Sequence, residues 1–253
     1  MVTLRRLNMD SSWAISWEGT SMLIDPWLLG SGVDGYSWFN EQWHVTPPVA
    51  IKSLDQYQSI LISQSYPDHC HKETLEALEA VPYIVTPSAL KRIKREMPGR
   101  EVCILPELSS GNWLLEGSLH LAYLDPGRMI DPIFNGIIIR HDRQAIVYFP
   151  HGFTLQAKQL DILRQYDILV VMTSFASFKL PFFLGGAVNP GIENALALVN
   201  ALNPRKVVHT HDENKHAKGL VKKIAKLNYP TPEQLQATMA DRFVYVQYDP
   251  LEI

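Results

Sequence analysis

Cysteine is scarce in this sequence: only Cys70 and Cys103 occur among its 253 residues. Two thiols cannot build a disulfide framework, and so few cysteines are typical of a reducing compartment. The chain also lacks any run of about 18 apolar residues, so no transmembrane helix is expected. The first ten residues carry Arg5 and Arg6 but no apolar stretch of the kind found in signal peptides. These absences lead us to expect a soluble, cytoplasmic protein.

An excess of positive charge is missing as well. Lys and Arg number 23 against 26 Asp and Glu, which gives a net charge of -3 at neutral pH. This charge gives no electrostatic reason to expect a nucleic-acid partner. Hydrophobic residues make up 46% and charged residues 19% of the chain, proportions typical of globular proteins. Because no linker divides the sequence, we expect a single domain over residues 1–253 and a small-molecule substrate, with oligomerisation left open.

A cluster of polar side chains follows a short apolar segment in the first third of the chain. Ile60-Leu61-Ile62 predicts a buried strand, and residues 72–80 predict an amphipathic helix. Between them stands Gln64-Ser65-Tyr66-Pro67-Asp68-His69-Cys70-His71. A loop between a strand and a helix holds polar side chains on a rigid rim. Asp68 and His69 are therefore candidates for a functional site.

This loop resembles the H-x-H-x-D-H signature of the metallo-β-lactamase superfamily, which also follows a hydrophobic strand. Asp68 and His69 match its last two positions, whereas Gln64 and Tyr66 stand where its first two histidines belong. The resemblance implies a site at the strand ends that holds up to two metal ions. The two replacements decide which of those ions this chain is expected to keep.

An earlier aspartate resembles the first motif of the same family. Residues 13–18 and 22–24 predict the two strands of a hairpin, and the second strand runs into Asp25-Pro26. In the family, an aspartate at this strand end lies beneath the metal site. The alternative is a plain turn, because Asp-Pro often begins one.

One of the two family metal sites is expected to be lost here. It takes the two early histidines and a third from a later strand end, but Gln64 and Tyr66 are poor ligands for transition metals. The later segment offers only Asp125, since His120 and His141 fall inside predicted strands. We expect Gln64 and Tyr66 to fill this place with hydrogen bonds instead of metal bonds.

The other family site is better preserved. His211 aligns better than His209 with the C-terminal ligand, and His151, in a Pro-His-Gly segment after residues 146–149, replaces the family's bridging aspartate. A turn that faces solvent is the alternative for His151. The resemblance thus implies one divalent metal ion, zinc before iron or manganese. Its expected ligands and supporting residue are Asp68, His69, His151, His211 and Asp25.

The resemblance also implies a hydrolase that acts on a small ester, a lactone or a related bond. Its candidate catalytic residues are Asp68, Tyr66 and His71, with Tyr66 or His71 donating a hydrogen bond to a developing oxyanion. One alternative is a binding protein of this fold that has lost its metals. Another is a hydrolase of a lipid-like substrate, suggested by the apolar loop 178–186.

The order of predicted elements indicates the fold. Strands are followed by mixed strand–helix units, twice over, which fits an α/β four-layer αβ/βα sandwich, also the superfamily's fold. Residues 217–227 predict a helix and residues 243–248 a closing edge strand. The aromatic stretch 29–48 shows no period, so it is either a flap beside the site or a cap over the edge of the core.

Overall fold

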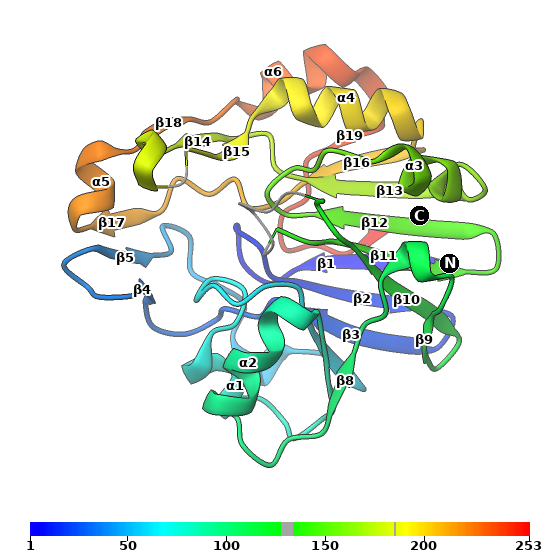
Figure 1. Cartoon of the computed structure of the whole chain (residues 1–253), viewed down its shortest axis with the longest axis horizontal. Coiled ribbons are helices and arrows are strands. Elements are labelled where there is room, and N and C mark those ends of the chain that lie inside the picture. Colours follow the sequence, from blue (N-terminus) through cyan, green and yellow to red (C-terminus); the bar gives the residue numbers. More distant parts are fainter. Residues whose placement is uncertain (128–133, 185) are drawn as a thin grey trace.

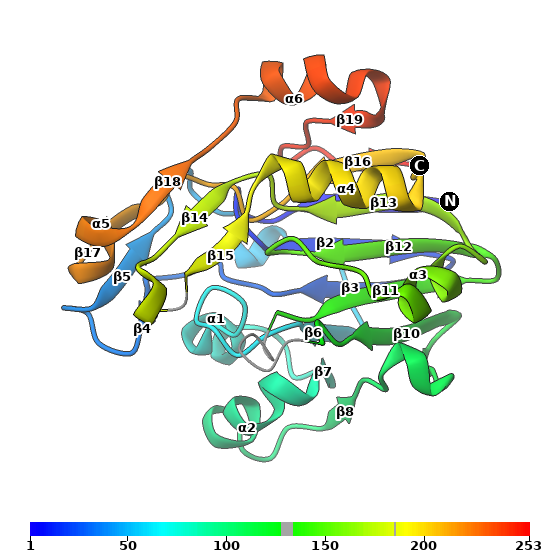
Figure 2. The ribbon, with the colours of Figure 1, turned by 45° about the horizontal axis from the view of Figure 1, so that its top comes forward.

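Two seven-stranded sheets pack face to face, and helices cover both outer faces (Figures 1 and 2). The computed structural model describes residues 1–127, 134–184 and 186–253. The first sheet consists, in spatial order, of β20 (Leu251–Glu252), β1 (Val2–Arg6), β2 (Trp13–Trp17), β3 (Thr20–Ile24), β6 (Ser59–Ile62), β7 (Tyr83–Val85) and β8 (Val102–Ile104). The second consists of β19 (Phe243–Val244), β16 (Lys206–His209), β13 (Asp167–Thr173), β12 (Gln144–Phe149), β11 (Gly136–His141), β10 (Leu119–Leu124) and β9 (Leu114–Glu116). The expected αβ/βα sandwich is confirmed.

Side chains that alternate along the strands place apolar residues on both faces of each sheet. In β12, Ile146 and Tyr148 join the central core between the sheets, while Ala145, Val147 and Phe149 pack under the outer helices. Successive side chains of a strand point to opposite faces, so a strand buried on both sides is apolar throughout.

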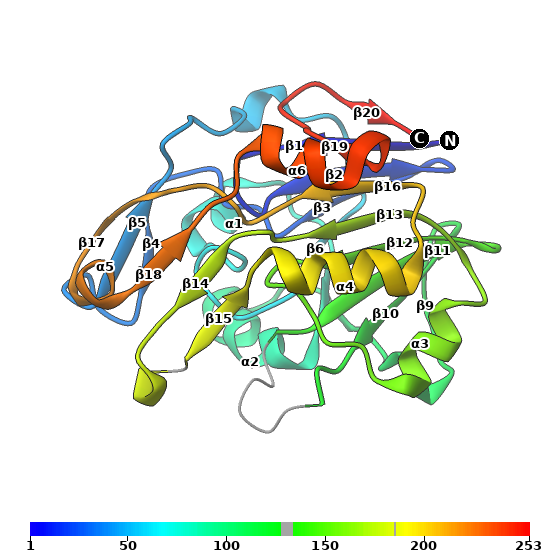
Figure 3. The same ribbon diagram turned by 90° about the horizontal axis from the view of Figure 1, so that it is seen from above.

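Helices pack their apolar residues against the outer faces of the two large sheets. The first sheet carries α1 (Lys72–Ala77) and α2 (Pro87–Glu96), and the second carries α3 (Ala157–Leu163), α4 (Ile192–Leu202) and α6 (Pro232–Met239). Figure 3 shows α4 and α6 lying over the second sheet. No helix in the described part of the chain is long and apolar enough to cross a membrane.

Two small sheets lie at one end of the sandwich, away from both termini (Figure 1). One consists of β15 (Ala187–Pro190), β14 (Ser177–Lys179) and β18 (Lys226–Asn228), and the other of β17 (His216–Lys218), β5 (Asn40–Trp43) and β4 (Gly32–Asp34). The stretch 29–48 therefore contains a hairpin, which its sequence does not signal.

The helix predicted over residues 217–227 is confirmed only for Leu220–Ile224. This segment divides into β17, the short helix α5 (Leu220–Ile224) and β18. Gly219 ends the first strand with φ of 103°, and a Cβ there would come within 2.6 Å of the Phe39 carbonyl oxygen. Only glycine fits this combination of backbone angle and close approach. The strand predicted over 243–248 is confirmed only for Phe243–Val244.

Parallel strands at the centre of each sheet bring their carboxyl ends to one edge. β3 pairs with β6 in the first sheet, and β12 and β16 both pair with β13 in the second, all in parallel. Ligand sites in α/β proteins collect beyond such strand ends. The segments that follow β3, β6, β12 and β16 carry Asp25, Asp68, His69, His151 and His211.

Candidate metal centre

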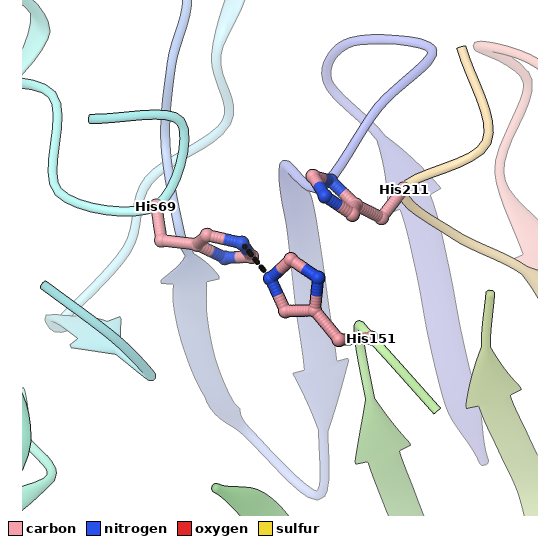
Figure 4. A group of neighbouring side chains, drawn as sticks. All are labelled: His69, His151 and His211. Atoms are coloured by element: carbon pink, nitrogen blue, oxygen red, sulfur yellow. Dashed lines mark hydrogen bonds between the residues drawn. The ribbon is translucent and has the colours of Figure 1, made fainter. Parts of the chain in front are cut away.

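Three histidines from three separate strand ends face one another (Figure 4). One ring nitrogen from each of His69, His151 and His211 lies within 4.8 Å of the others. Nε2 of His69 is 3.1 Å from Nε2 of His151, and the His151 and His211 ring centroids are 4.4 Å apart. His69 is fully buried and His151 nearly so. The structure thus brings together segments up to 142 residues apart in the sequence, from His69 to His211.

Hydrogen bonds behind the rings fix which nitrogen faces the centre. Nδ1 of His69 donates to Oδ2 of Asp25 at 2.8 Å, because a carboxylate only accepts. Nδ1 of His151 donates to Oδ1 of Asn189 at 2.7 Å, and the Asn189 amide nitrogen in turn donates to the Ser174 hydroxyl. Both Nδ1 atoms therefore carry hydrogen, so the two facing Nε2 atoms are lone-pair donors when the rings are neutral.

A carboxylate also stands behind the ring of His211. Its Nδ1 lies 3.1 Å from Oδ1 of Asp10, at ion-pair distance but without the alignment of a hydrogen bond. Its Nε2 lies 3.7 Å from Oδ2 of Asp68, and Oδ1 of Asp68 lies 4.0 Å from Nε2 of His69. Asp68 therefore stands beside the same nitrogens, although its oxygens are grouped with Asp10 and His211 and not with all three histidines.

The backbone is strained at two residues of this cluster. Asp25 has φ of 47° and His211 has φ of 54°, both in the left-handed region. For residues with a side chain this region costs about 1–2 kcal/mol each. Such strain is found where a side chain must point in one direction, and here it aims each residue at the histidine group.

Asp10 and Asp68 share the ammonium group of Lys215. Nζ of Lys215 lies 2.8 Å from Oδ2 of Asp10 and 3.5 Å from Oδ2 of Asp68. It also stands 5.5 Å from the centre of the Trp27 ring. Asp10, Asp68 and His211 form a second set of closely spaced ligand atoms, and Lys215 places a positive charge beside that set.

Electrostatics at the cluster place a proton on one particular histidine. Burial alone would lower the pKa of His69, but the carboxylates of Asp25 and Asp68 outweigh it and raise that pKa above its ordinary value. Burial and the neighbouring imidazoles of His211 and His69 lower the pKa of His151 well below its usual range. Without metal, and below the raised pKa of His69, Nε2–H of His69 donates to Nε2 of His151.

The carboxylates stay ionised throughout. Burial alone would raise the pKa of Asp68, but His69, Lys215 and His211 together hold that pKa well below its usual range. Asp10 is buried too, and the charges of His211 and Lys215 lower its pKa in the same way. Both aspartates are therefore negative at neutral pH.

Asp25 lies behind His69, on the far side of the ring from Nε2. Its carboxylate accepts hydrogen bonds from the backbone and hydroxyl of Ser63, from the Tyr148 hydroxyl and from His69. This position orients the histidine and places no Asp25 oxygen among the grouped ligand atoms. The expectation of an aspartate beneath the site agrees with this geometry.

His71 lies outside the histidine group. It caps the N-terminus of α1, where Nδ1 accepts from the Thr74 backbone at 3.3 Å and Nε2 lies 3.1 Å from the Ser31 carbonyl oxygen. Both nitrogens are thus used in holding the loop to the helix. Tyr66, in contrast, lines the cavity beside Asp68 and stacks on Phe134 at 6.0 Å.

Gln64 does not make the hydrogen bonds expected of it. Its side chain is fully buried, and neither the amide nitrogen nor the amide oxygen has a hydrogen-bond partner among the residues that the structure describes. The other residues considered for the first family site contact residues outside the histidine group. Asp125 accepts from the Gly127 backbone, His120 packs edge-on against Trp113, and His141 lies near Trp17.

A cavity of about 370 Å³ opens onto the histidine group. Asp68, His151 and His211 form its polar floor. The two small sheets form largely apolar walls, to which Phe39, Phe178, Leu180, Leu184, Val188, Val221 and Leu227 contribute. The aromatic stretch 29–48 and the loop 178–186 thus line one cavity. Among the aromatic residues of the first stretch, Phe39 lines the cavity, while Tyr36 and Trp38 are exposed. Asp34, Asn40 and Gln42 from the same stretch also line it.

The residues present fit a divalent metal ion. Three imidazoles and a carboxylate are the donors that zinc and other borderline cations prefer. Nitrogens bound tetrahedrally to one zinc stand about 3.3 Å apart, given bond lengths near 2.0–2.1 Å. The 3.1 Å between His69 and His151 is close to this separation. Neutral rings would also leave two buried lone pairs facing each other, which a cation between them would satisfy.

Sequence reasoning missed Asp10, Asn189 and Lys215. Asp10 lies in the turn between β1 and β2, within the polar run Asn8-Met9-Asp10-Ser11-Ser12, whose members other than Met9 are fully buried. Polar residues grouped between two apolar strands were the available signal. Lys215 and Asn189 carry no local pattern that separates them from surface residues.

Comparison with known proteins agrees with this geometry. Residues 8–211 match the model of a family described as a beta-lactamase superfamily domain, well over half of the chain. No curated protein matches the sequence significantly.

Solved structures share the fold at low sequence identity. An isothiocyanate hydrolase from Delia radicum gut bacteria has a TM-score of 0.72 at 14% identity, covering 100% of this chain and 99% of that one. A possible metal-dependent hydrolase from Veillonella parvula has a TM-score of 0.74 at 12% identity, covering 100% of both chains. A metallo hydrolase from the archaeon Ignicoccus hospitalis has a TM-score of 0.66 at 16% identity, covering 100% and 99%. With residues 8–211 matching the family model, this chain belongs to the metallo-β-lactamase superfamily.

Proposed function

We propose that this protein is a metal-dependent hydrolase with a single divalent ion, which acts on a small ester, a lactone or a related bond. The observation that carries the proposal is the pair of Nε2 atoms of His69 and His151, 3.1 Å apart, with both Nδ1 atoms engaged as donors. His211 and Asp68 complete a set of four ligands. Zinc suits this set best, and iron or manganese are the alternatives.

The balance of buried charge supports a divalent ion at this place. Three carboxylates, Asp10, Asp25 and Asp68, surround the histidines, and Lys215 balances one of them. Buried charges are costly unless they are paired. An ion of charge two among neutral imidazoles would balance the other two carboxylates.

Each residue of the centre has a distinct part in the proposed reaction. The metal ion, when bound, supplies Lewis acidity and lowers the pKa of water. Asp25 and Asn189 hold the rings of His69 and His151 with Nε2 inward, as partners behind metal ligands commonly do. Tyr66 lines the cavity beside Asp68, where its hydroxyl can donate to an oxyanion that develops on the substrate.

The substrate class follows from the ligands that are replaced. Gln64 and Tyr66 stand in place of two ligands of a second ion, so the site has the charge to stabilise one developing oxyanion. A carboxylic ester or a lactone requires no more than that, whereas a phosphodiester develops more negative charge. The apolar walls of the cavity would hold the carbon skeleton and keep bulk water away from the reacting group.

Metal analysis combined with a small substrate panel tests the proposal. Protein purified without added metal is expected to contain one first-row metal ion per chain and to hydrolyse aryl esters or lactones. Replacing His151 with alanine should remove the metal and the activity while the circular dichroism spectrum stays unchanged. The matched control is His141→Ala, which removes an imidazole at the far end of β11. A His151→Ala variant that keeps its full metal content would contradict the proposed ligand set.

The second candidate function is a binding protein of this fold without metal. It is favoured by one observation: a proton on His69 lets Nε2–H donate to His151, so the 3.1 Å contact is satisfied without an ion. Lys215 already supplies a positive charge to Asp10 and Asp68. Protein that stays free of metal after dialysis against zinc, yet binds hydrophobic ligands in the cavity, would establish this function.

A further inference from the structure

Exposed hydrophobic side chains are concentrated on the two small sheets. Six of the eleven large hydrophobic residues exposed in the described part of the chain belong to them or to the turns that join their strands. They are Tyr36, Trp38, Phe182, Phe183, Leu220 and Leu227. We call this end of the molecule the aromatic end. Phe182 and Phe183 are 94% and 81% exposed, so they do not contribute to the core.

The aromatic tips come from two segments that lie around the same cavity. Trp38 lies in the turn between β4 and β5, and its carbonyl oxygen accepts from the Leu220 backbone at 3.0 Å. Phe182 and Phe183 lie between β14 and β15, next to Leu184, which lines the cavity. Figures 1 and 2 both place these segments at the end of the sandwich opposite the termini. Exposed hydrophobic groups gathered in this way mark an interaction surface.

Positive charge is concentrated on the sheet of β15, β14 and β18 and on the segment from β17 to β18, whereas β4 and β5 carry Asp34 and Glu41. Neither residues 174–190 nor residues 214–229 contain an acidic side chain, although the whole protein carries a net charge of -3. Lys222 and Lys223 on α5, Lys179 on β14 and Lys226 on β18 are exposed. No ion pair joins these four lysines to another residue in the described part of the chain, whereas Lys218 nearby is paired with Glu41.

Two of these lysines oppose each other directly. Lys179 and Lys226 are register partners in the antiparallel pair of β14 and β18, so their side chains stand side by side on one face. Like charges in this position destabilise a sheet. A sheet that keeps such a pair gains from an anionic partner that neutralises both charges. This observation is independent of the aromatic residues and points to the same surface.

We propose that the aromatic end docks onto an anionic lipid surface. Aromatic side chains insert at the level of the lipid headgroups. Lysines beside them attract acidic phospholipids, and each lysine strengthens binding roughly fivefold. A second copy of this chain fits the surface less well, because a two-fold interface would set the lysines of both copies against one another. The proposal does not depend on the metal centre.

Sedimentation with vesicles tests this proposal directly. Wild-type protein is expected to sediment with vesicles of phosphatidylcholine mixed with phosphatidylglycerol, to do so far less with phosphatidylcholine alone, and to be released by salt. Lys226→Glu should weaken binding by an order of magnitude or more. The same change turns the pair with Lys179 into one of opposite charge, so the melting temperature should not fall. Replacing both Phe182 and Phe183 with serine should also release the protein.

Two controls match these variants in chemistry at other places. Lys94→Glu makes the same charge change on the exposed side of α2, and Leu115→Ser removes an exposed hydrophobic side chain from β9. Both should bind vesicles like wild type. The proposal is overturned if wild type does not sediment with the anionic vesicles, or if Lys94→Glu weakens binding as much as Lys226→Glu. It is also overturned if light scattering shows a dimer that the double serine variant dissociates while vesicles bind neither protein.

Discussion

The ammonium group of Lys215 lies 2.8 Å from Oδ2 of Asp10, inside the charged cluster beside the three histidines. It also approaches Asp68, and both carboxylates belong to a group of ligand atoms that His211 completes. Members of the family hold up to two metal ions at these strand ends. In this chain a lysine stands beside that group of ligand atoms and supplies a fixed positive charge to both carboxylates.

Replacing Lys215 with methionine tests that relationship. The change leaves the buried carboxylate of Asp10 and the partly exposed carboxylate of Asp68 without their cation. Breaking a buried ion pair typically costs about 3–5 kcal/mol. At roughly 2–4 °C per kcal/mol for a chain of this size, the melting temperature should fall by about 6–20 °C. Added zinc should restore much of this loss and raise the metal content towards two per chain. Lys218→Met is the control, since the Lys218 side chain is more than half exposed and ion pairs at the surface contribute little to stability. A Lys215→Met protein that melts like wild type would show that the lysine is not needed to neutralise the cluster.

Replacing Asp25 with asparagine distinguishes a ligand from a residue that orients a ligand. Asparagine keeps the size of the side chain but removes the charge that holds Nδ1 of His69. Partners behind metal ligands contribute about 10–100-fold to metal affinity. Titration with zinc should therefore show an affinity weakened by that factor, with one ion still bound at saturation. Loss of all binding, as expected for His151→Ala, would make Asp25 a direct ligand.

Metal binding should release a proton near neutral pH. The pKa of His69 is raised by Asp25 and Asp68 despite burial, so its Nε2 carries hydrogen in the metal-free protein up to that raised pKa. The pKa of His151 is depressed, so that ring is already neutral and releases nothing. Affinity should fall as the pH drops below the pKa of His69, and about one proton should leave per ion bound. Calorimetry in buffers of different ionisation enthalpy measures this number. A value near zero at pH 6 would show that Nε2 of His69 carries no proton in the metal-free protein.

The sequence predicts the residues whose position depends on a strand end. Asp25, Asp68, His69, His151 and His211 each follow a buried apolar segment, and parallel strands bring such ends to one edge. The sequence does not predict the contacts that distant residues make with the site. Lys215 meets Asp10 across about 200 residues, and neither stands in a periodic segment.

Only part of the helix predicted over residues 217–227 forms, because contacts with distant residues also decide the structure of this segment. Leu220, Val221, Ile224 and Leu227 have helical spacing, which favours a helix when only local pattern is considered. Strand pairing with β5 on one side and β14 on the other outweighs that preference, and it depends on residues far away in the chain. Tertiary context of this kind commonly overrides local propensity.

Gln64 gives a prediction about stability that is independent of the metal. Its amide is fully buried and makes no hydrogen bond within the described ranges 1–127, 134–184 and 186–253. An unsatisfied polar group of this kind costs about 1–3 kcal/mol. Gln64→Met keeps the length of the side chain and removes the amide, so the melting temperature should rise by roughly 2–12 °C.

The matched control is Gln159→Met, in which an equally buried glutamine loses real partners. The Gln159 amide donates to the Asp125 carbonyl oxygen at 2.7 Å and accepts from the Gln156 backbone at 3.0 Å. Its replacement should lower the melting temperature, the opposite of what we expect for Gln64. If Gln64→Met destabilises the protein as much as Gln159→Met does, the Gln64 amide has a partner in solution. The place of the lost histidine would then be a hydrogen-bonded site, as the sequence alone suggests.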